Sequence, residues 1–192
     1  MLRALCCGLI LNSWITVSAQ SYQGLEAVNL VNVINGDSIA LDHKTSGPLV
    51  VVIFTSNTCP YSTKYENRII DLYNDFSKRD VQLFLVNPNG GEEDNVEKMR
   101  EKANTASFPF PYLKDHEQVL TQIFGVTRTP EAYLLRPEST GFELVYRGPI
   151  DDNPQTGMDV DRNYLRTAIE NSLKGNPVPN TAGRVTGCLI KN

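Results

Sequence analysis

The chain has 192 residues, of which 41% are hydrophobic, and a formal net charge of -4. Its length suits one domain with a single core, since no repeat or low-complexity tract divides it. The small negative charge and the lack of a basic cluster exclude the usual signature of a nucleic-acid-binding protein.

The start of the chain has the pattern of a secretory signal peptide. A basic residue at Arg3, an apolar run as far as Ile15 and small residues up to Ala19 follow one another. The apolar run is interrupted, and it is shorter than the about twenty residues that a membrane span requires. We therefore expect cleavage after Ala19, export to the periplasm or the cell exterior, and no membrane span in the mature chain. Cleavage would also remove Cys6 and Cys7.

Two cysteines, Cys59 and Cys188, remain after that cleavage. An exported chain meets an oxidising environment, in which two cysteines are a candidate disulfide rather than a metal site. The two histidines, His43 and His116, lack the spacing of metal ligands. No glycine-rich phosphate loop and no pair of catalytic carboxylates can be assembled, so we predict neither a metal nor a cofactor.

The first elements of the mature chain form a predicted hairpin over 25–41. Apolar residues occupy both arms, and Asn35-Gly36 between them is the strongest two-residue signal for a hairpin turn. The pattern therefore predicts an N-terminal β-hairpin in front of the central strand.

A buried strand followed by a helix comes next, with Cys59 between them. Leu49 to Phe54 is a continuous apolar run, which is typical of a strand buried on both faces. From Pro60 onward the apolar positions recur at three- and four-residue steps, as in an amphipathic helix. Proline favours the first helical position, so Cys59 lies at or next to the N-cap. The helix dipole and the unpaired N–H groups there favour the thiolate, which is the nucleophilic form of the sulfur.

The rest of the domain alternates between strands and helices. Strands are predicted at 81–87, 112–115, 131–136 and 142–147, and helices at 92–103, 117–124 and 162–173. Strand-helix-strand units imply a parallel centre of the sheet, and the hairpin of the last two strands implies an antiparallel edge. The predicted fold class is therefore α/β, with a central mixed sheet and flanking helices.

The turn Thr55-Ser56-Asn57-Thr58-Cys59-Pro60 resembles the active-site turn of the thioredoxin superfamily. Arg128-Thr129-Pro130 before a strand, and Val145-Tyr146-Arg147-Gly148 on the next strand, match in the same order. More closely, the chain resembles the redoxin proteins of the alkyl-hydroperoxide-reductase and thiol-specific-antioxidant group, which share Phe-Pro-Tyr-Leu, Arg-Thr-Pro-Glu and a terminal Gly-Cys-x-Ile-Lys. This resemblance covers nearly the whole mature chain. It implies a thioredoxin-like domain over 20–175, followed by an extended tail over 176–192.

One position departs from that group, since Ser56 stands where the first cysteine of a Cys-x-x-Cys pair is expected. Ser56 also matches the Thr/Ser-x-x-Cys part of the peroxiredoxin signature, in which the hydroxyl hydrogen-bonds the peroxide or the sulfur. The same signature also contains a proline seven positions before the cysteine, where this chain has Val52. The resemblance therefore implies that Cys59 is the redox-active thiol, with half of the peroxidase motif present.

Five neighbouring residues complete the implied active site: Thr55, Pro60, Arg128, Thr129 and Pro130. Pro130 matches the cis-proline of thioredoxin-like proteins, which presents the backbone of the preceding residue to an extended substrate segment. Arg128 has two interpretations. It is either a solvated surface residue or the arginine that holds the thiolate and polarises a peroxide in peroxiredoxin-like relatives.

The tail after the last predicted helix carries the second cysteine. Residues 176–184 are rich in Pro, Asn, Gly and Thr, which is typical of extended, irregular chain, and 185–190 are apolar enough to dock. A tail of about fifteen residues spans up to roughly 50 Å, so it can return to the active-site edge of the sheet. The alternative is a frayed terminus. If the tail docks, Cys188 can form a disulfide with Cys59 and act as the resolving thiol that Ser56 cannot be.

Three functions fit these residues. The first is an exported thiol oxidoreductase in which Cys59 attacks a peroxide or a protein disulfide, and Cys188 or an external thiol reductant regenerates it. The second is a thioredoxin-type thiol-disulfide reductase crippled by Ser56. The third is a redox-inactive binding module that keeps the fold and uses the groove beside Pro130 to hold an extended segment.

Overall fold

The computed structural model describes residues 20–179 and 183–191, so the predicted signal peptide at 1–19, with Cys6 and Cys7, lies outside the described residues. Within the described ranges, eight strands form one sheet in the order β1-β9-β8-β4-β5-β6-β2-β3, and β7 pairs separately with β10. No helix in these ranges is long and apolar enough to cross a membrane.

The elements alternate along the chain much as the sequence predicts. The strands are β1 (Ser21–Tyr22), β2 (Leu30–Asn32), β3 (Ser38–Ile39), β4 (Leu49–Phe54), β5 (Val81–Asn87), β6 (Tyr112–Lys114), β7 (Arg128–Thr129), β8 (Glu131–Glu138), β9 (Gly141–Gly148) and β10 (Cys188–Leu189). The α-helices are α1 (Pro60–Phe76), α2 (Val96–Thr105), α3 (Val119–Phe124) and α4 (Tyr164–Leu173), and the 3-10 helices are η1 (Leu25–Ala27), η2 (Ser77–Arg79) and η3 (Glu92–Asp94).

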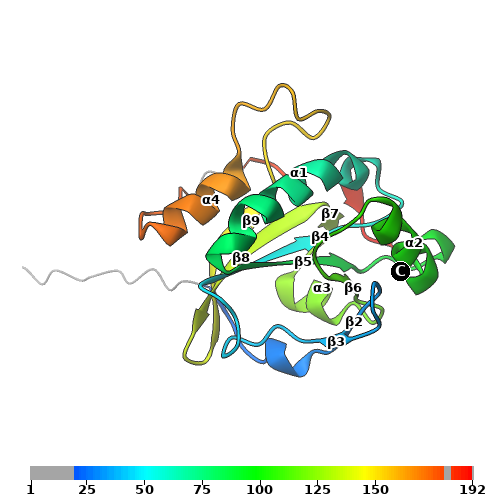
Figure 1. Cartoon of the computed structure of the whole chain (residues 1–192), viewed down its shortest axis with the longest axis horizontal. Helices are drawn as coiled ribbons and strands as arrows, with labels where there is room; N and C mark the ends of the chain where they lie inside the picture. The colour runs from blue at the N-terminus through cyan, green and yellow to red at the C-terminus, as the bar shows by residue number, and fades with distance from the viewer. Residues whose placement is uncertain (1–19, 180–182, 192) are drawn as a thin grey trace, which may run out of the picture.

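The core consists of two apolar clusters, one on each face of the sheet. All six residues of β4 are buried, the odd-numbered ones in one cluster and the even-numbered ones in the other. Helices α1, α2 and α4 contribute to the first cluster and α3 to the second. Figure 1 shows α1 and α4 on one side of the sheet and α3 on the other. The predicted strand with two buried faces is therefore confirmed.

The strand directions also agree with the prediction. β4 pairs in parallel with β5, and β5 in parallel with β6. β8 pairs antiparallel with both β4 and β9. The α/β class, with a mixed sheet between helices, is confirmed.

Several bounds differ from the prediction. The N-terminal hairpin is present but shorter: β2 and β3 pair antiparallel, and the first residues of 25–41 form η1 instead. The predicted helix 92–103 is divided, because the side chain of Asn95 accepts a hydrogen bond from Lys98 N and begins α2 there. The last hairpin is longer than predicted, since its strands extend to Glu138 and Gly141. β1 is too short to show a pattern in the sequence.

The carboxyl ends of the parallel strands meet at one edge of the sheet. β4 ends at Phe54, β5 at Asn87 and β6 at Lys114, so the residues that follow these strands lie close together. β8 runs the opposite way and begins beside the end of β4, with Glu131 opposite Phe54. The segment before β8, which contains β7, therefore lies at this edge too.

Candidate active site

The turn that carries Cys59 leaves the sheet at this edge. Thr55 N donates to Val86 O at 2.8 Å, so the first residue after β4 is still held by β5. Cys59 is the N-cap of α1 and Pro60 occupies its first turn, as predicted from the sequence. The cysteine side chain accepts no capping hydrogen bond from the helix.

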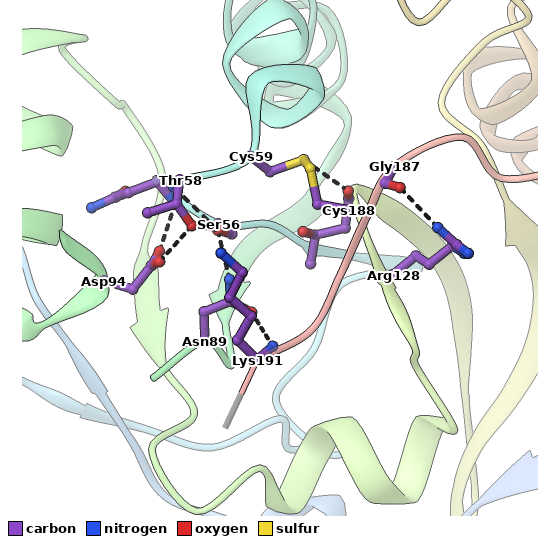
Figure 2. The surroundings of a disulfide bond; sticks show 11 residues. Ser56, Thr58, Cys59, Asn89, Asp94, Arg128, Gly187, Cys188 and Lys191 are labelled. Carbon is purple, nitrogen blue, oxygen red and sulfur yellow. Dashed lines mark hydrogen bonds between the residues drawn. A yellow bond between two sulfur atoms is a disulfide. The ribbon is translucent and has the colours of Figure 1, made fainter. Parts of the chain in front are cut away.

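Cys59 is joined to Cys188 by a disulfide that links positions 129 residues apart in the chain. The two Cα atoms are 5.8 Å apart. Figure 2 shows the tail passing the start of α1 with the sulfurs between them. Because the tail covers the turn, Cys59 is only 1% exposed. The sulfur therefore lies at the helix start, as the sequence predicts, but it is covered by the tail.

The tail docks as a short strand rather than as a frayed terminus. β10 pairs antiparallel with β7, with Cys188 opposite Thr129 and Leu189 opposite Arg128. The peptide bond between Thr129 and Pro130 is cis, as the resemblance implies. Cys59 Sγ lies 3.2 Å from Thr129 O, so the disulfide is next to the backbone of the residue before this proline.

Arg128 lies beside the tail in this structure. Its Nη1 donates to Gly187 O at 3.0 Å. In Figure 2 the guanidinium points toward Gly187 and away from the two sulfurs. In the disulfide form Arg128 therefore holds the docked tail.

Gly187 is required by the close approach of the tail to β7. A side-chain carbon at this position would collide with the carbonyl group of Thr129 and crowd Pro130 N. The residue immediately before Cys188 therefore has to be glycine for the tail to take this path.

Ser56 is buried and fully engaged in hydrogen bonds. Its Oγ accepts from Asn89 Nδ2 at 2.9 Å and from Thr58 N at 3.2 Å, and it shares a further hydrogen bond of 3.0 Å with Thr58 Oγ1. Ser56 is 3% exposed. The Ser56 hydroxyl therefore organises the turn.

Asp94 also holds this turn, through hydrogen bonds from Asn57 and Thr58. Its carboxylate is 1% exposed and accepts from Asn57 N at 2.7 Å, Thr58 Oγ1 at 2.9 Å and Asn87 Nδ2 at 2.8 Å. A buried carboxylate needs such donors in place of water. The sequence predicted that this residue is part of the first turn of a helix, and its role in fixing the turn before Cys59 was missed.

Lys114 supports the loop between β5 and α2. Its ammonium group donates to Asp94 O at 2.8 Å and also to Asn89 O. Burial lowers the pKa of Lys114 below its ordinary value, because a charged amine loses water there. The lysine therefore ties together the two residues whose side chains contact the turn, Asn89 and Asp94.

Sequence reasoning missed Asn87, Asn89, Asp94 and Lys114 as parts of the site. A usable signal was present: all four follow or end the parallel strands β5 and β6, whose carboxyl ends meet beside Cys59. Within 20–179 and 183–191, no three His, Cys, Asp or Glu residues are grouped to hold a metal ion.

Comparison with known proteins places the chain in a family. Residues 24–142 match the AhpC/TSA family. The chain belongs to this family. A search of curated proteins gives no match.

Two solved structures resemble nearly the whole chain. An uncharacterized conserved protein from Geobacillus kaustophilus has 31% identity and a TM-score of 0.78, over 90% of this chain and 93% of that one. A hypothetical protein from Sinorhizobium meliloti 1021 has 28% identity and a TM-score of 0.76, over 91% and 98% of the two chains. Neither title states an activity.

Peroxiredoxin Q from Xanthomonas campestris, solved as a cysteine-to-serine mutant, has 19% identity and a TM-score of 0.58, over 82% of this chain and 97% of that one. At this identity the likeness concerns the fold alone. It confirms the thioredoxin-like fold class that we predicted for this chain.

Proposed function

We propose that this AhpC/TSA-family chain is an exported thiol oxidoreductase in which Cys59 attacks a peroxide or a protein disulfide and Cys188 resolves the oxidised Cys59. The observation that carries the proposal is the disulfide between a cysteine at a helix start and a cysteine in a docked tail. The signal-peptide pattern at the start of the chain and the use of a disulfide both support an oxidising compartment.

With a peroxide, the Cys59 thiolate attacks one oxygen and the O–O bond breaks. The other oxygen leaves as water or an alcohol after taking a proton, and Cys59 becomes a sulfenic acid. The Cys188 thiol then attacks the Cys59 sulfur, water leaves, and the internal disulfide forms. An external dithiol reductant returns two electrons and two protons and is itself oxidised to a disulfide.

With a protein disulfide, the Cys59 thiolate attacks one sulfur and forms a mixed disulfide, releasing the other substrate sulfur as a thiol. Cys188 then attacks Cys59, and the second substrate sulfur leaves as a thiolate. Either substrate thus ends in the same internal disulfide. Ser56 is not needed as a resolving residue, because the second sulfur comes from the tail.

The experiment uses the chain from Gln20 onward, reduced and freed of reductant. One equivalent of hydrogen peroxide should yield the Cys59–Cys188 disulfide, detected by mass spectrometry as the loss of two hydrogens. Cys188→Ser should stop at a sulfenic acid that a trapping reagent captures, and Cys59→Ser should not consume peroxide. A Cys59 that is never oxidised by peroxide or by a model disulfide would contradict the proposal.

A second candidate is the binding module, and the burial of Cys59 favours it. In this alternative the disulfide only fastens the tail, which itself occupies the β7 edge beside Pro130, and an extended partner binds there by displacing the tail. Titration of Cys59 alkylation in the Cys188→Ser variant separates the two, because a midpoint near the ordinary thiol value of about 8.5 favours a binding module over a reactive thiolate.

The thioredoxin-type reductase is tested by restoring the missing sulfur. The variant Ser56→Cys would compete with Cys188 for Cys59 and would lose the hydrogen bond from Asn89 to the serine hydroxyl. A large gain in protein-disulfide reduction by Ser56→Cys over the natural sequence would favour that class.

A further inference from the structure

The end of the tail is held by contacts beyond Cys188. Ile190 N donates to Thr127 O at 3.1 Å, and Lys191 N donates to the side-chain oxygen of Asn89 at 3.1 Å. Gly90 N donates to Lys191 O at 3.0 Å. The loop that follows β5 is therefore a docking site for the last described residues of the chain.

Asn89 contacts at once the two segments that carry the disulfide cysteines. One side-chain atom, Oδ1, accepts from the tail at Lys191, and the other, Nδ2, donates to Ser56 Oγ in the turn that carries Cys59. Figure 2 shows Asn89 between the turn and the tail. The residue is 1% exposed.

The backbone of Asn89 is fixed independently of the tail. Asn89 N donates to Asn87 Oδ1 at 3.0 Å, and Asn89 O accepts from the buried ammonium group of Lys114. A side chain on a backbone held in this way is a rigid reference point, against which the turn and the tail are both placed.

We propose that Asn89 is a positioning residue that sets the register of the tail, so that Cys188 faces Cys59. The inference rests on the proposed function where it treats Cys188 as the resolving thiol. It adds a group that touches neither sulfur and acts on the disulfide through Lys191 and Ser56.

Such a residue is needed because the β7–β10 pairing is only two residues long. β10 has two residues, and a slip of one residue turns every side chain of a strand to its other face. A slip would therefore direct Cys188 away from Cys59. The bond from Lys191 N to Asn89 Oδ1 lies three residues beyond Cys188 and is lost when the tail slips, so it penalises the wrong register.

The first test is the thiol-disulfide equilibrium of the full mature chain with glutathione, which measures the effective concentration of Cys188 at Cys59. Asn89→Ala removes two hydrogen bonds, and we expect the effective concentration to fall about tenfold or more. The matched control is Asn95→Ala, which removes the N-cap hydrogen bond to Lys98 N in the same loop. It should change the equilibrium by less than about twofold while lowering unfolding stability.

A second pair of variants tests the same contact without touching the core. Lys191 is exposed. Lys191→Pro deletes the N–H group that donates a hydrogen bond to Asn89 Oδ1, whereas Lys191→Ala keeps that group. We expect Lys191→Pro to lower the effective concentration about three- to tenfold, the worth of one hydrogen bond, and Lys191→Ala to leave it unchanged. In the Asn89→Ala background, the Lys191→Pro substitution should have no further effect.

Three results would overturn the inference: an unchanged equilibrium in Asn89→Ala, equal values for Lys191→Pro and Lys191→Ala, or full additivity in the double variant. If Asn89→Ala fails to fold, the Lys191 pair still decides. Because the readout is a disulfide equilibrium rather than substrate turnover, a chain that reduces neither a peroxide nor a protein disulfide would refute the proposed function and leave this test intact.

Discussion

The two antiparallel pairings at the end of the chain, β8 with β9 and β7 with β10, are held in different ways. β8 and β9 have eight residues each and follow one another directly in the chain. β7 and β10 have two residues each and are fastened by the disulfide, by Arg128 and by the loop after β5.

This contrast indicates which part of the molecule depends on redox state. The β8–β9 hairpin closes a short loop and buries Tyr133, Leu135 and Phe142 in the core, so apolar burial stabilises it. The β7–β10 pairing closes a long loop, and besides the disulfide it is supported by a few polar contacts and by the packing of one partly buried side chain, Ile190. We therefore expect reduction to release the tail and to leave the hairpin in place.

The largest effect should come from Cys188→Ser. The disulfide links residues 129 positions apart, so its removal increases the conformational entropy of the unfolded chain. The unfolding free energy should therefore fall by about 5 kcal/mol on the chain-entropy estimate. Urea unfolding measures this loss, and the reduced natural sequence is the matched control. Hydrogen exchange should show rapid exchange of the Ile190 amide with the β8–β9 amides still protected. A protected Ile190 amide in the variant would show that the noncovalent contacts, including the packing of Ile190, suffice to dock the tail.

The next effect is expected from Gly187→Ala. The added carbon collides with the Thr129 carbonyl, and overpacking of this kind costs about 1–3 kcal/mol. The glutathione equilibrium should therefore show a fall of about fivefold to 150-fold in the effective concentration of Cys188. Gly183→Ala is the control. The nearest atom to a Cβ added there is the Tyr164 hydroxyl oxygen at 3.3 Å, which lies at the end of a side chain. Similar values for the two variants would contradict the assigned path of the tail.

Alkaline pH should act on buried tyrosines of the core rather than on the tail, and Tyr146 of the hairpin is one of them. Burial raises the pKa of Tyr146, on β9, above its ordinary value of 10.0. Above pH 10 the unfolded phenol loses its proton while the folded one keeps it, so the folded state binds more protons and unfolding free energy falls as pH rises.

Tyr146→Phe removes this contribution, and the slope of stability against pH above 10 should become shallower by up to about 1.4 kcal/mol per pH unit. Denaturant unfolding between pH 8 and pH 11 measures the slope, and the range below pH 9 serves as the internal control, where the two proteins should run parallel. An unchanged slope above pH 10 would show that the Tyr146 hydroxyl titrates as in water.

The smallest effect should come from Arg128→Gln. The variant loses one hydrogen bond to Gly187 O from a half-buried guanidinium, so the effective concentration of Cys188 should fall about three- to tenfold. The rate of Cys59 oxidation by peroxide is measured in parallel, with Arg128→Lys as the variant that keeps the charge. If Arg128 also polarises the peroxide, that rate will fall far more than the disulfide equilibrium changes.

The local pattern was enough to place the central strand and Cys59. Leu49–Phe54 is apolar throughout, and Pro60 marks the first turn of a helix, so β4, α1 and the N-cap position of the cysteine follow from neighbouring residues. The last hairpin and the mixed sheet follow from the order of elements. These features depend on interactions within a few residues or on rules of chain connection.

The partners of the turn could not be placed in this way. Asn89 and Asp94 have the composition of a solvated loop, and only the convergence of strand ends at one edge buries them against Ser56 and Thr58. Their role depends on the positions of β5 and β6 in the sheet, which no local pattern contains.

The sequence alone was sufficient to predict the core strands and to place Cys59 at the start of a helix, because apolar periodicity and the effect of proline are local. The sequence left open whether the tail docks and whether Cys188 meets Cys59, and the folded chain decided both. The place of Asn89 between turn and tail became apparent only from the folded chain. A two-residue strand has too little pattern to specify its partner, so its pairing is set by contacts between residues far apart in the chain.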